Sequence, residues 1–228
     1  MLIQQHIRVT VDAVVFGYSA KQGISVLLIK RKIPPHIFKW ALPGGFVHND
    51  ESFEDGIKRE LREEAGITIN YLEQLYTFGA PERDPRGRII SIAYYALVDP
   101  SNFKLAPDTD AEAAQWCPID ELPFLAFDHK EIIALAQERL RNKIRYEPIG
   151  FELLGKKFSM AELESLYTHL LGRSVDRRNF QKKILSFGFL KTLPEKQKHP
   201  QQGRPAQLYS FDEKKYHALK KEGIFFEV

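Results

Sequence analysis

The chain has 228 residues, of which 43% are hydrophobic, and a formal net charge of +3. This length and composition suit two globular domains and exclude a largely disordered protein. The single cysteine, Cys117, excludes an intrachain disulfide, and no apolar run approaches the roughly 18 residues typical of a transmembrane helix. With no signal-peptide pattern either, we expect a soluble protein in a reducing cytoplasm.

Charge is distributed unevenly along the chain. Residues 1–145 hold 18 basic and 20 acidic residues, whereas residues 146–228 hold 15 basic and 10 acidic ones. Residues 173–204 alone contain nine basic and two acidic residues. Because local positive charge favours an anionic partner, we expect the two parts to have different functions. We predict one domain over 1–145 and a second over 146–228, joined at Glu147-Pro148-Ile149-Gly150.

The first part mixes strands and helices. Alternating apolar residues predict strands at 8–17, 24–31, 71–78, 89–98 and 113–118. A helical stretch should end near Ala65, where Gly66 suits a left-handed cap, and a second helix should start at Asp128. This pattern predicts a layered domain of the α/β or α+β class.

Three carboxylates stand out on the first of these helices. Glu60, Glu63 and Glu64 share one helix face, where like charges repel unless something positive lies between them. A hard divalent cation such as Mg²⁺ takes oxygen ligands and polarises phosphoryl oxygens. A solvated acidic face is the alternative, but it does not account for the residues around the cluster.

Those residues complete a longer motif. Residues 45–67 resemble the Nudix box, Gly-x5-Glu-x7-Arg-Glu-aliphatic-x-Glu-Glu-x-Gly-aliphatic, at every specified position. The resemblance implies an α/β/α sandwich with a mixed sheet, and water attack on nucleoside diphosphates linked to another moiety, with Mg²⁺ or Mn²⁺. It also implies roles for six residues. Glu60, Glu63 and Glu64 are the catalytic residues and metal ligands, Gly45 supplies a backbone oxygen to the metal, and Glu51 with Arg59 forms an orienting ion pair.

A loop rich in arginine follows at residues 81–88. Arg83, Arg86 and Arg88 have the geometry to contact a diphosphate or ribose, although a solvated turn is the alternative. Residues 78–95 resemble the same region in Nudix proteins that handle ADP-ribose, which favours ligand binding.

Other polar residues of the first part carry less information. Candidates for a catalytic base outside the box are Glu82, Asp84 and Glu112. The spacing of His48, His129 and Cys117 is not that of a zinc site, so packing or capping roles are expected for them.

The pattern of the second part predicts a helix-turn-helix. Ser159 and Glu162 form a capping box that starts a helix over 160–171, and a second helix should run from about 176 to 187. The exposed side of that second helix suits DNA, because Arg and Asn read base edges and Lys meets phosphates. The candidate DNA-binding residues there are Arg177, Arg178, Asn179, Lys182 and Lys183.

Two strands, 189–193 and 207–211, should enclose a basic loop that contains Arg204. This arrangement predicts a small winged helix-turn-helix domain whose wing touches DNA. The alternative is a dimerisation or protein-interaction module with a solvated basic face, which the charge of residues 173–204 disfavours.

The whole chain resembles the Nudix-related transcriptional regulators of bacteria, including residues 125–129 and 203–206. The resemblance implies a homodimer on a palindromic double-stranded DNA operator, controlled by ADP-ribose, a related nucleotide or a sugar such as arabinose. Many such regulators have a degenerate box, whereas this one is complete. An active pyrophosphohydrolase of the ADP-ribose type therefore remains the alternative, and activation or repression stays open.

Overall fold

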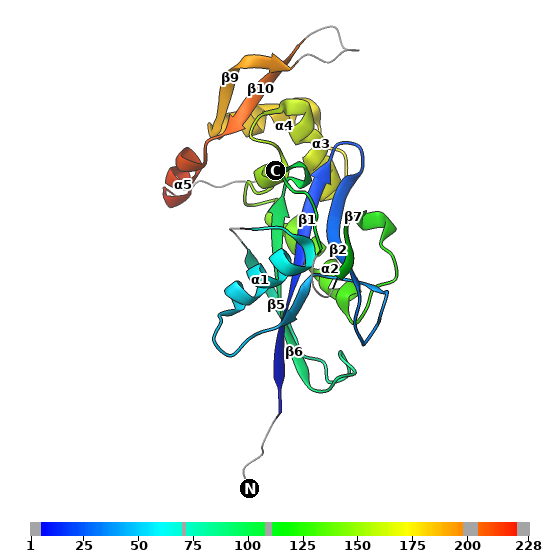
Figure 1. Cartoon of the computed structure of the whole chain (residues 1–228). Coiled ribbons are helices and arrows are strands. Elements are labelled where there is room, and N and C mark those ends of the chain that lie inside the picture. Colours follow the sequence, from blue (N-terminus) through cyan, green and yellow to red (C-terminus); the bar gives the residue numbers. More distant parts are fainter. Residues whose placement is uncertain (1–5, 70–71, 108–110, 198–204, 223–228) are drawn as a thin grey trace. The chain divides into compact units, whose positions relative to one another are not determined.

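The computed structural model describes residues 6–69, 72–107, 111–197 and 205–222 (Figure 1). Contacts divide the chain into two units, one of Met1–Gly17 with Ile24–Arg139 and one of Tyr18–Gly23 with Leu140–Val228. The boundary at 145/146 expected from the sequence stays a prediction. Each unit is described by itself.

A seven-stranded mixed sheet organises the first unit (Figure 1). Its main path has the order β3-β2-β1-β6-β5, with β4 paired to β1 and β7 paired to β2. β1 and β6 are parallel, whereas β5 runs antiparallel to β6. The strands are β1 (Arg8–Ser19), β2 (Gly23–Arg31), β3 (Trp40–Ala41), β4 (Gly44–Phe46), β5 (Glu73–Phe78), β6 (Ile89–Val98) and β7 (Ala111–Pro118).

The first helix, α1 (Phe53–Ala65), packs on this sheet through one apolar stripe. Ile57, Leu61 and Ala65 are fully buried in a core shared with β1 and β6. The side chain of Ser52 accepts the backbone N–H of Asp55 at the start of α1, and Gly66 ends the helix with φ 70°. The left-handed cap predicted from the sequence is confirmed.

The opposite face of the sheet is covered as well. Alternate residues of a strand point to opposite faces, and Val11, Ala13 and Val15 of β1 pack on the α1 side. Val14 and Phe16 therefore point to the other face, where they are also fully buried. The second helix, α2 (His129–Lys143), buries Ile132, Ile133 and Ala136. Short 3₁₀ turns, η1 (Pro100–Asn102) and η2 (Ile119–Glu121), flank β7. The predicted α/β/α sandwich with a mixed sheet is confirmed.

The second unit has the order expected of a winged helix. A 3₁₀ turn, η3 (Phe151–Leu153), precedes β8 (Phe158–Ser159), α3 (Met160–Leu171), α4 (Arg177–Ser186), β9 (Leu190–Gln197), β10 (Ala206–Phe211) and α5 (Glu213–Lys221). The capping box of α3 forms as predicted. The strands make a sheet of order β8-β10-β9, so β8 adds to the predicted hairpin a third strand that the sequence did not indicate.

A cluster of aromatic side chains lies in this unit. Phe151 stacks on Phe211 with 4.2 Å between ring centroids, and Phe189 meets the same ring edge-on. Tyr216 of α5 contacts Phe189 and Phe211, which holds α5 against the sheet. Across the described residues of both units, no helix is long and apolar enough to cross a membrane.

Candidate functional site

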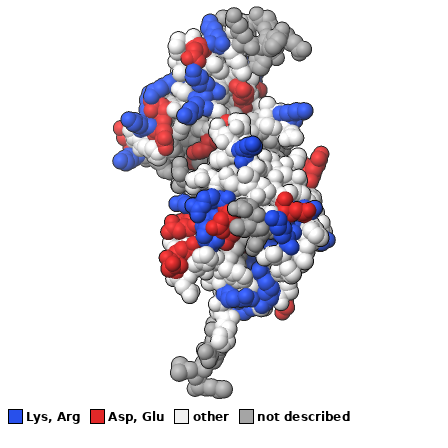
Figure 2. Space-filling model, viewed as in Figure 1, with Lys and Arg blue, Asp and Glu red and all other residues white. Residues whose placement is uncertain are grey.

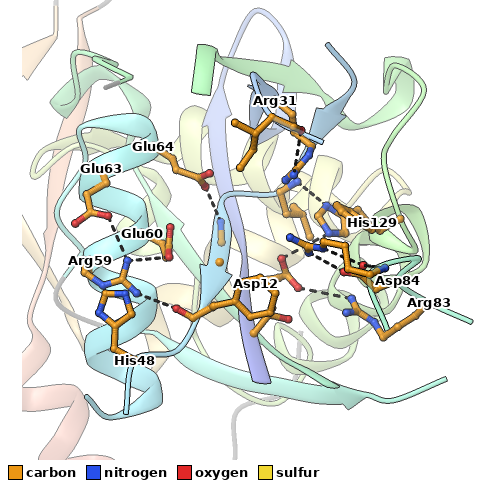
Figure 3. Close-up of a pocket in the computed structure, with 18 residues that line it drawn as sticks. Asp12, Arg31, His48, Arg59, Glu60, Glu63, Glu64, Arg83, Asp84 and His129 are labelled. Carbon is orange, nitrogen blue, oxygen red and sulfur yellow. Dashed lines mark hydrogen bonds and ion pairs between the residues drawn. The ribbon is translucent and has the colours of Figure 1, made fainter. Parts of the chain in front are cut away.

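A cavity of about 430 Å³ opens in the first unit between α1, β1 and the start of α2 (Figure 3). One wall carries Glu60, Glu63 and Glu64, the carboxylates of the Nudix-like box. The facing wall carries the guanidinium groups of Arg31 and Arg83 (Figure 3), and Arg86 and the carboxylates of Asp12 and Asp84 also line the cavity. A cavity with carboxylates on one wall and guanidinium groups on the other suits a ligand that bears phosphate groups, because a bound cation and arginine forks can bind its oxygens from two sides.

Arg59 organises the acidic wall. Its Nη2 and Nε donate to the two carboxylate oxygens of Glu51 at 2.7 and 3.0 Å, and Nη2 also donates to the carbonyl of Phe46 at 3.1 Å. The hydrogen bonds from Arg59 lower the pKa of Glu51 to about 2, so the carboxylate stays charged. This pair ties the loop before α1 to the helix itself.

The same guanidinium also reaches two of the box carboxylates. Nη1 of Arg59 donates to Glu60 at 2.8 Å and to Glu63 at 3.2 Å. Hydrogen bonding to Glu51 in the first place, and then to Glu60, raises the pKa of Arg59 above its ordinary value. Glu60 and Glu63 therefore already converge on one positively charged group.

Glu64 points to a different partner. Its carboxylate accepts the backbone N–H of Gly44 at 2.8 Å, and only 4% of the residue is exposed. Burial raises the pKa of Glu64 to about 8. A side chain at Gly44, which has φ 156°, would meet the carbonyl of Val11, and one at Gly45 would meet the carboxylate of Glu60. Glycine is required at Gly44 because the obstacle is backbone, whereas a side chain at Gly45 would displace the carboxylate of Glu60.

The donor chemistry of this wall fits a hard divalent cation, because every candidate donor is an oxygen. Glu60 and Glu63 show the needed convergence, since both contact the same nitrogen of Arg59. Within the described ranges, however, no three His, Cys, Asp or Glu side chains are gathered as a ready-made ligand set. The residue types thus fit Mg²⁺ or Mn²⁺, although the carboxylates are held by protein donors here.

The arginine loop contributes two of its three predicted ligand-binding residues to the cavity. Arg83 donates twice to Asp128, at 2.9 and 2.7 Å, and its side chain is 3% exposed. Arg86 binds both carboxylate oxygens of Asp84 and lies over the rings of Phe46 and Phe127, at 4.8 and 5.4 Å from their centroids.

The third arginine of the loop lies elsewhere. Arg88 donates to the carbonyl of Gly79 at 2.5 Å and is not among the residues that line the cavity. Of the three residues considered for a base outside the box, Asp84 lines the cavity. Glu112 pairs with Lys30 at 3.1 Å, and Glu82 is exposed, so neither faces the cavity.

Among the cavity residues that were not singled out as site residues from the sequence, three are buried and titratable: Asp12, Arg31 and His129. Asp12 accepts a hydrogen bond from the hydroxyl of Ser91, and its other oxygen lies 3.5 Å from Nε2 of His129. Arg31 donates from Nε to the carbonyl of Pro35 at 2.9 Å. The available signal was Asp12 itself, a charged residue inside a run of apolar strand residues.

The second candidate site is the outer face of α4. All five predicted DNA-binding residues on this helix are exposed, whereas Phe180 and Ile184 on its other side are buried. Nε of Arg177 lies 3.5 Å from Glu164 of α3. Arg204, the predicted wing residue, lies outside the described residues. Figure 2 shows basic and acidic side chains interspersed on the visible surface, and the case for DNA rests on the exposed face of α4.

Comparison with known protein families matches both units. The model of the NUDIX domain matches residues 6–136, and the model described as the NrtR DNA-binding winged helix domain matches residues 150–211. The predicted pairing of a Nudix domain with a winged helix is confirmed.

Three individual proteins are also similar. An ADPR responsive transcriptional repressor, NtrR, of Acinetobacter baylyi is 34% identical over 89% of this chain and 81% of its own. The structure of Shewanella oneidensis NrtR with a 27mer DNA is 32% identical, with a TM-score of 0.80 over 96% of this chain and 97% of its own. Its NUDIX domain, solved with ADP ribose, is 35% identical, with a TM-score of 0.54 over 60% of this chain and 90% of its own. An ADP-ribose pyrophosphatase of Methanocaldococcus jannaschii is 38% identical over 56% of this chain and 72% of its own.

Proposed function

Since this chain belongs to the NrtR family of Nudix proteins with a DNA-binding winged helix, we propose that it is a transcriptional repressor controlled by ADP-ribose. The observation that carries the proposal is the exposed basic face of α4 in a chain that also keeps a charged small-molecule cavity. A repressor needs both a DNA-reading surface and an effector site. Related proteins of the same architecture are an ADPR responsive repressor and a protein solved with DNA.

The DNA-reading surface is α4. Arg177, Arg178 and Asn179 occupy the first turn of the helix, which in helix-turn-helix proteins reaches base edges in the major groove. Lys182 and Lys183 lie one turn further along and suit phosphate contacts. Arg204 would add a contact from the wing.

The effector site is the cavity beside α1. ADP-ribose carries a diphosphate between two riboses, and the two charged walls suit that diphosphate. On one side Glu60, Glu63 and Glu64, with the carbonyl of Gly45, would hold Mg²⁺ or Mn²⁺, which would neutralise phosphate charge. On the other side Arg83 and Arg86 are held by carboxylates, so their remaining N–H groups are fixed in direction.

We also propose that the protein acts as a homodimer on a palindromic operator, because two α4 helices related by a two-fold axis read two half-sites. A role on operator DNA places the protein in the bacterial cytoplasm. The Acinetobacter relative is a repressor, which favours repression over activation for this chain.

Fluorescence anisotropy with DNA from upstream of its own gene, in moderate salt with nonspecific competitor, tests this proposal. We expect selective binding that ADP-ribose reverses and arabinose leaves unchanged. Reversal by arabinose alone would show that arabinose, and not ADP-ribose, is the effector. Binding no stronger than that of the competitor DNA would reject the repressor.

A second candidate function is ADP-ribose hydrolysis. It is favoured by the complete box and by the likeness to an ADP-ribose pyrophosphatase. In that case Glu60, Glu63 and Glu64 would serve as catalytic residues around the metal. Incubation with ADP-ribose and Mg²⁺ should then release AMP, and Glu64→Gln should abolish the release. No product from the wild-type protein would leave effector binding as the only role of the cavity.

A further inference from the structure

Asp128 and His129 stand next to each other where α2 begins, and each holds a different part of the cavity wall. We propose that these two residues are positioning residues for the effector: His129 fixes the loop of residues 42–45, which contains Gly44 and Gly45, and Asp128 fixes Arg83. The inference rests on the proposed function, because it names the residues that shape the cavity for ADP-ribose without requiring either of them to touch the ligand.

His129 controls the loop through one backbone hydrogen bond. Its Nδ1 accepts the N–H of Leu42 at 2.8 Å, and the residue is 3% exposed. The next residues of the loop are tied elsewhere, since Ala13 donates to the carbonyl of Pro43 at 2.9 Å and Gly44 donates to Glu64 at 2.8 Å. The loop is therefore held at three successive residues, and His129 supplies the first of these hydrogen bonds.

The hydrogen bond also fixes the state of the imidazole ring. A nitrogen that accepts an N–H carries no proton, so the neutral ring has its proton on Nε2. Nε2 lies 3.5 Å from Oδ1 of Asp12. Burial lowers the pKa of His129, which keeps the ring in this neutral, accepting form. Packing alone would not need an acceptor at Nδ1.

Asp128 fixes a side chain on the facing wall of the cavity. Both of its oxygens accept from Arg83, at 2.9 and 2.7 Å, and this two-point geometry fixes the plane of the guanidinium. The Nη2 atom of Arg83 lies 3.7 Å from Asp12, the same carboxylate that faces His129. Asp128 and His129, at the start of α2, therefore fix the positions of Arg83 and of the loop. Asp12 of β1 lies close to both Arg83 and His129.

Substitutions at His129 separate hydrogen bonding from packing. Asn places its side-chain oxygen near the position of Nδ1 and can accept from Leu42, whereas Leu fills the space without an acceptor. Lys130→Ala, at an exposed position of the same helix turn, is the matched control. In the full-length protein we expect His129→Leu to weaken ADP-ribose binding by about tenfold, because a buried N–H is left without a partner. The affinity of His129→Asn for ADP-ribose should stay within about threefold of the wild-type affinity, because the variant loses the ring but keeps the hydrogen bond.

Two measurements decide the outcome: calorimetric titration with ADP-ribose, and hydrogen exchange of the Leu42 amide in the free protein. Faster exchange and weaker binding in His129→Leu, with both restored in His129→Asn, would support the inference. Equal affinities in all variants, or equal losses in Leu and Asn, would overturn it. If His129→Leu fails to fold, Asp128→Asn decides, because an unchanged affinity there would also overturn the inference. A wild-type protein that binds no ADP-ribose would instead reject the proposed function.

Discussion

Glu64 carries its carboxyl group in a place that water barely reaches. Burial raises its pKa from 4.5 to about 8, so the folded protein favours the protonated form. A raised carboxyl pKa costs stability as pH rises from about 4.5 to about 8, because the folded state must then give up a proton that it holds more tightly. Glu64→Gln removes this cost and keeps an oxygen for Gly44. With metal chelated, we expect the variant to melt several degrees above the wild type at pH 8.5.

Scanning calorimetry at two pH values measures this effect. At pH 5 both proteins carry a neutral side chain at residue 64, so the gap between their melting temperatures should largely close. An equal gap at pH 5 and pH 8.5 would show that the carboxyl group is not titrating in this range.

Glu51 presents the opposite case. The hydrogen bonds from Arg59 lower its pKa from 4.5 to about 2, so the pair stabilises the fold above pH 4.5. This contribution should fade as pH falls from 4.5 towards 2. We expect Glu51→Gln to lower the free energy of unfolding by about 2 kcal/mol at pH 6, since Arg59 loses a charged partner. Urea unfolding at pH 6 and pH 3 measures it, and a difference that persists unchanged at pH 3 would contradict the ion-pair account.

The sequence predicted some cavity residues and not others, and contact range explains the difference. Arg59 and the three box carboxylates lie on one helix, so their spacing alone brings them together. Asp12 and His129 meet across more than a hundred residues, through strand pairing that no local pattern encodes. The same limit applies to Arg88, because the hairpin geometry, rather than the composition of the loop, decides which arginines face the cavity.

At the scale of elements, long periodic segments were predictable and short ones were not. The predicted helix 160–171 coincides with α3, because a capping box and Gly172 mark both of its ends. β3, β4 and β8 have two or three residues each, which is too short to show an alternating pattern. These short strands exist because neighbouring strands supply hydrogen-bonding partners. β4 matters most for function, since it holds the glycines beside Glu60 and Glu64.

The outer face of α4 makes a prediction of its own. Arg178→Ala should weaken operator binding by about 1–3 kcal/mol and reduce discrimination against other sequences, as expected when a base contact is lost. Lys183→Ala should weaken operator and nonspecific DNA alike, and should lower the salt dependence by about one counterion. Arg62→Ala, at an exposed basic position of α1, is the control and should change neither. Anisotropy titrations over a range of salt concentrations measure all three, and identical curves for wild type and Arg178→Ala would remove α4 as the reading helix.

At the scale of the whole molecule, α2 belongs to both units. His129 at its start lines the cavity; His129–Arg139 belong to the first unit and Leu140–Lys143 to the second. The first unit holds the cavity, and the second unit carries α4. A regulator needs a connection between its two sites, because effector binding must change the affinity of the other site.

Thermodynamic linkage turns this connection into a strict test. If saturating ADP-ribose weakens operator binding by some factor, saturating operator must weaken ADP-ribose binding by the same factor. We expect the two factors, from anisotropy and from calorimetry, to agree and to lie in the range of about 5–150 that is common for coupled sites. Release of DNA by a hydrolysis product would break this equality, since the titrated compound would not be the one that binds. Unequal factors, with release that grows with incubation time, would therefore favour the hydrolase and assign control of DNA binding to the product.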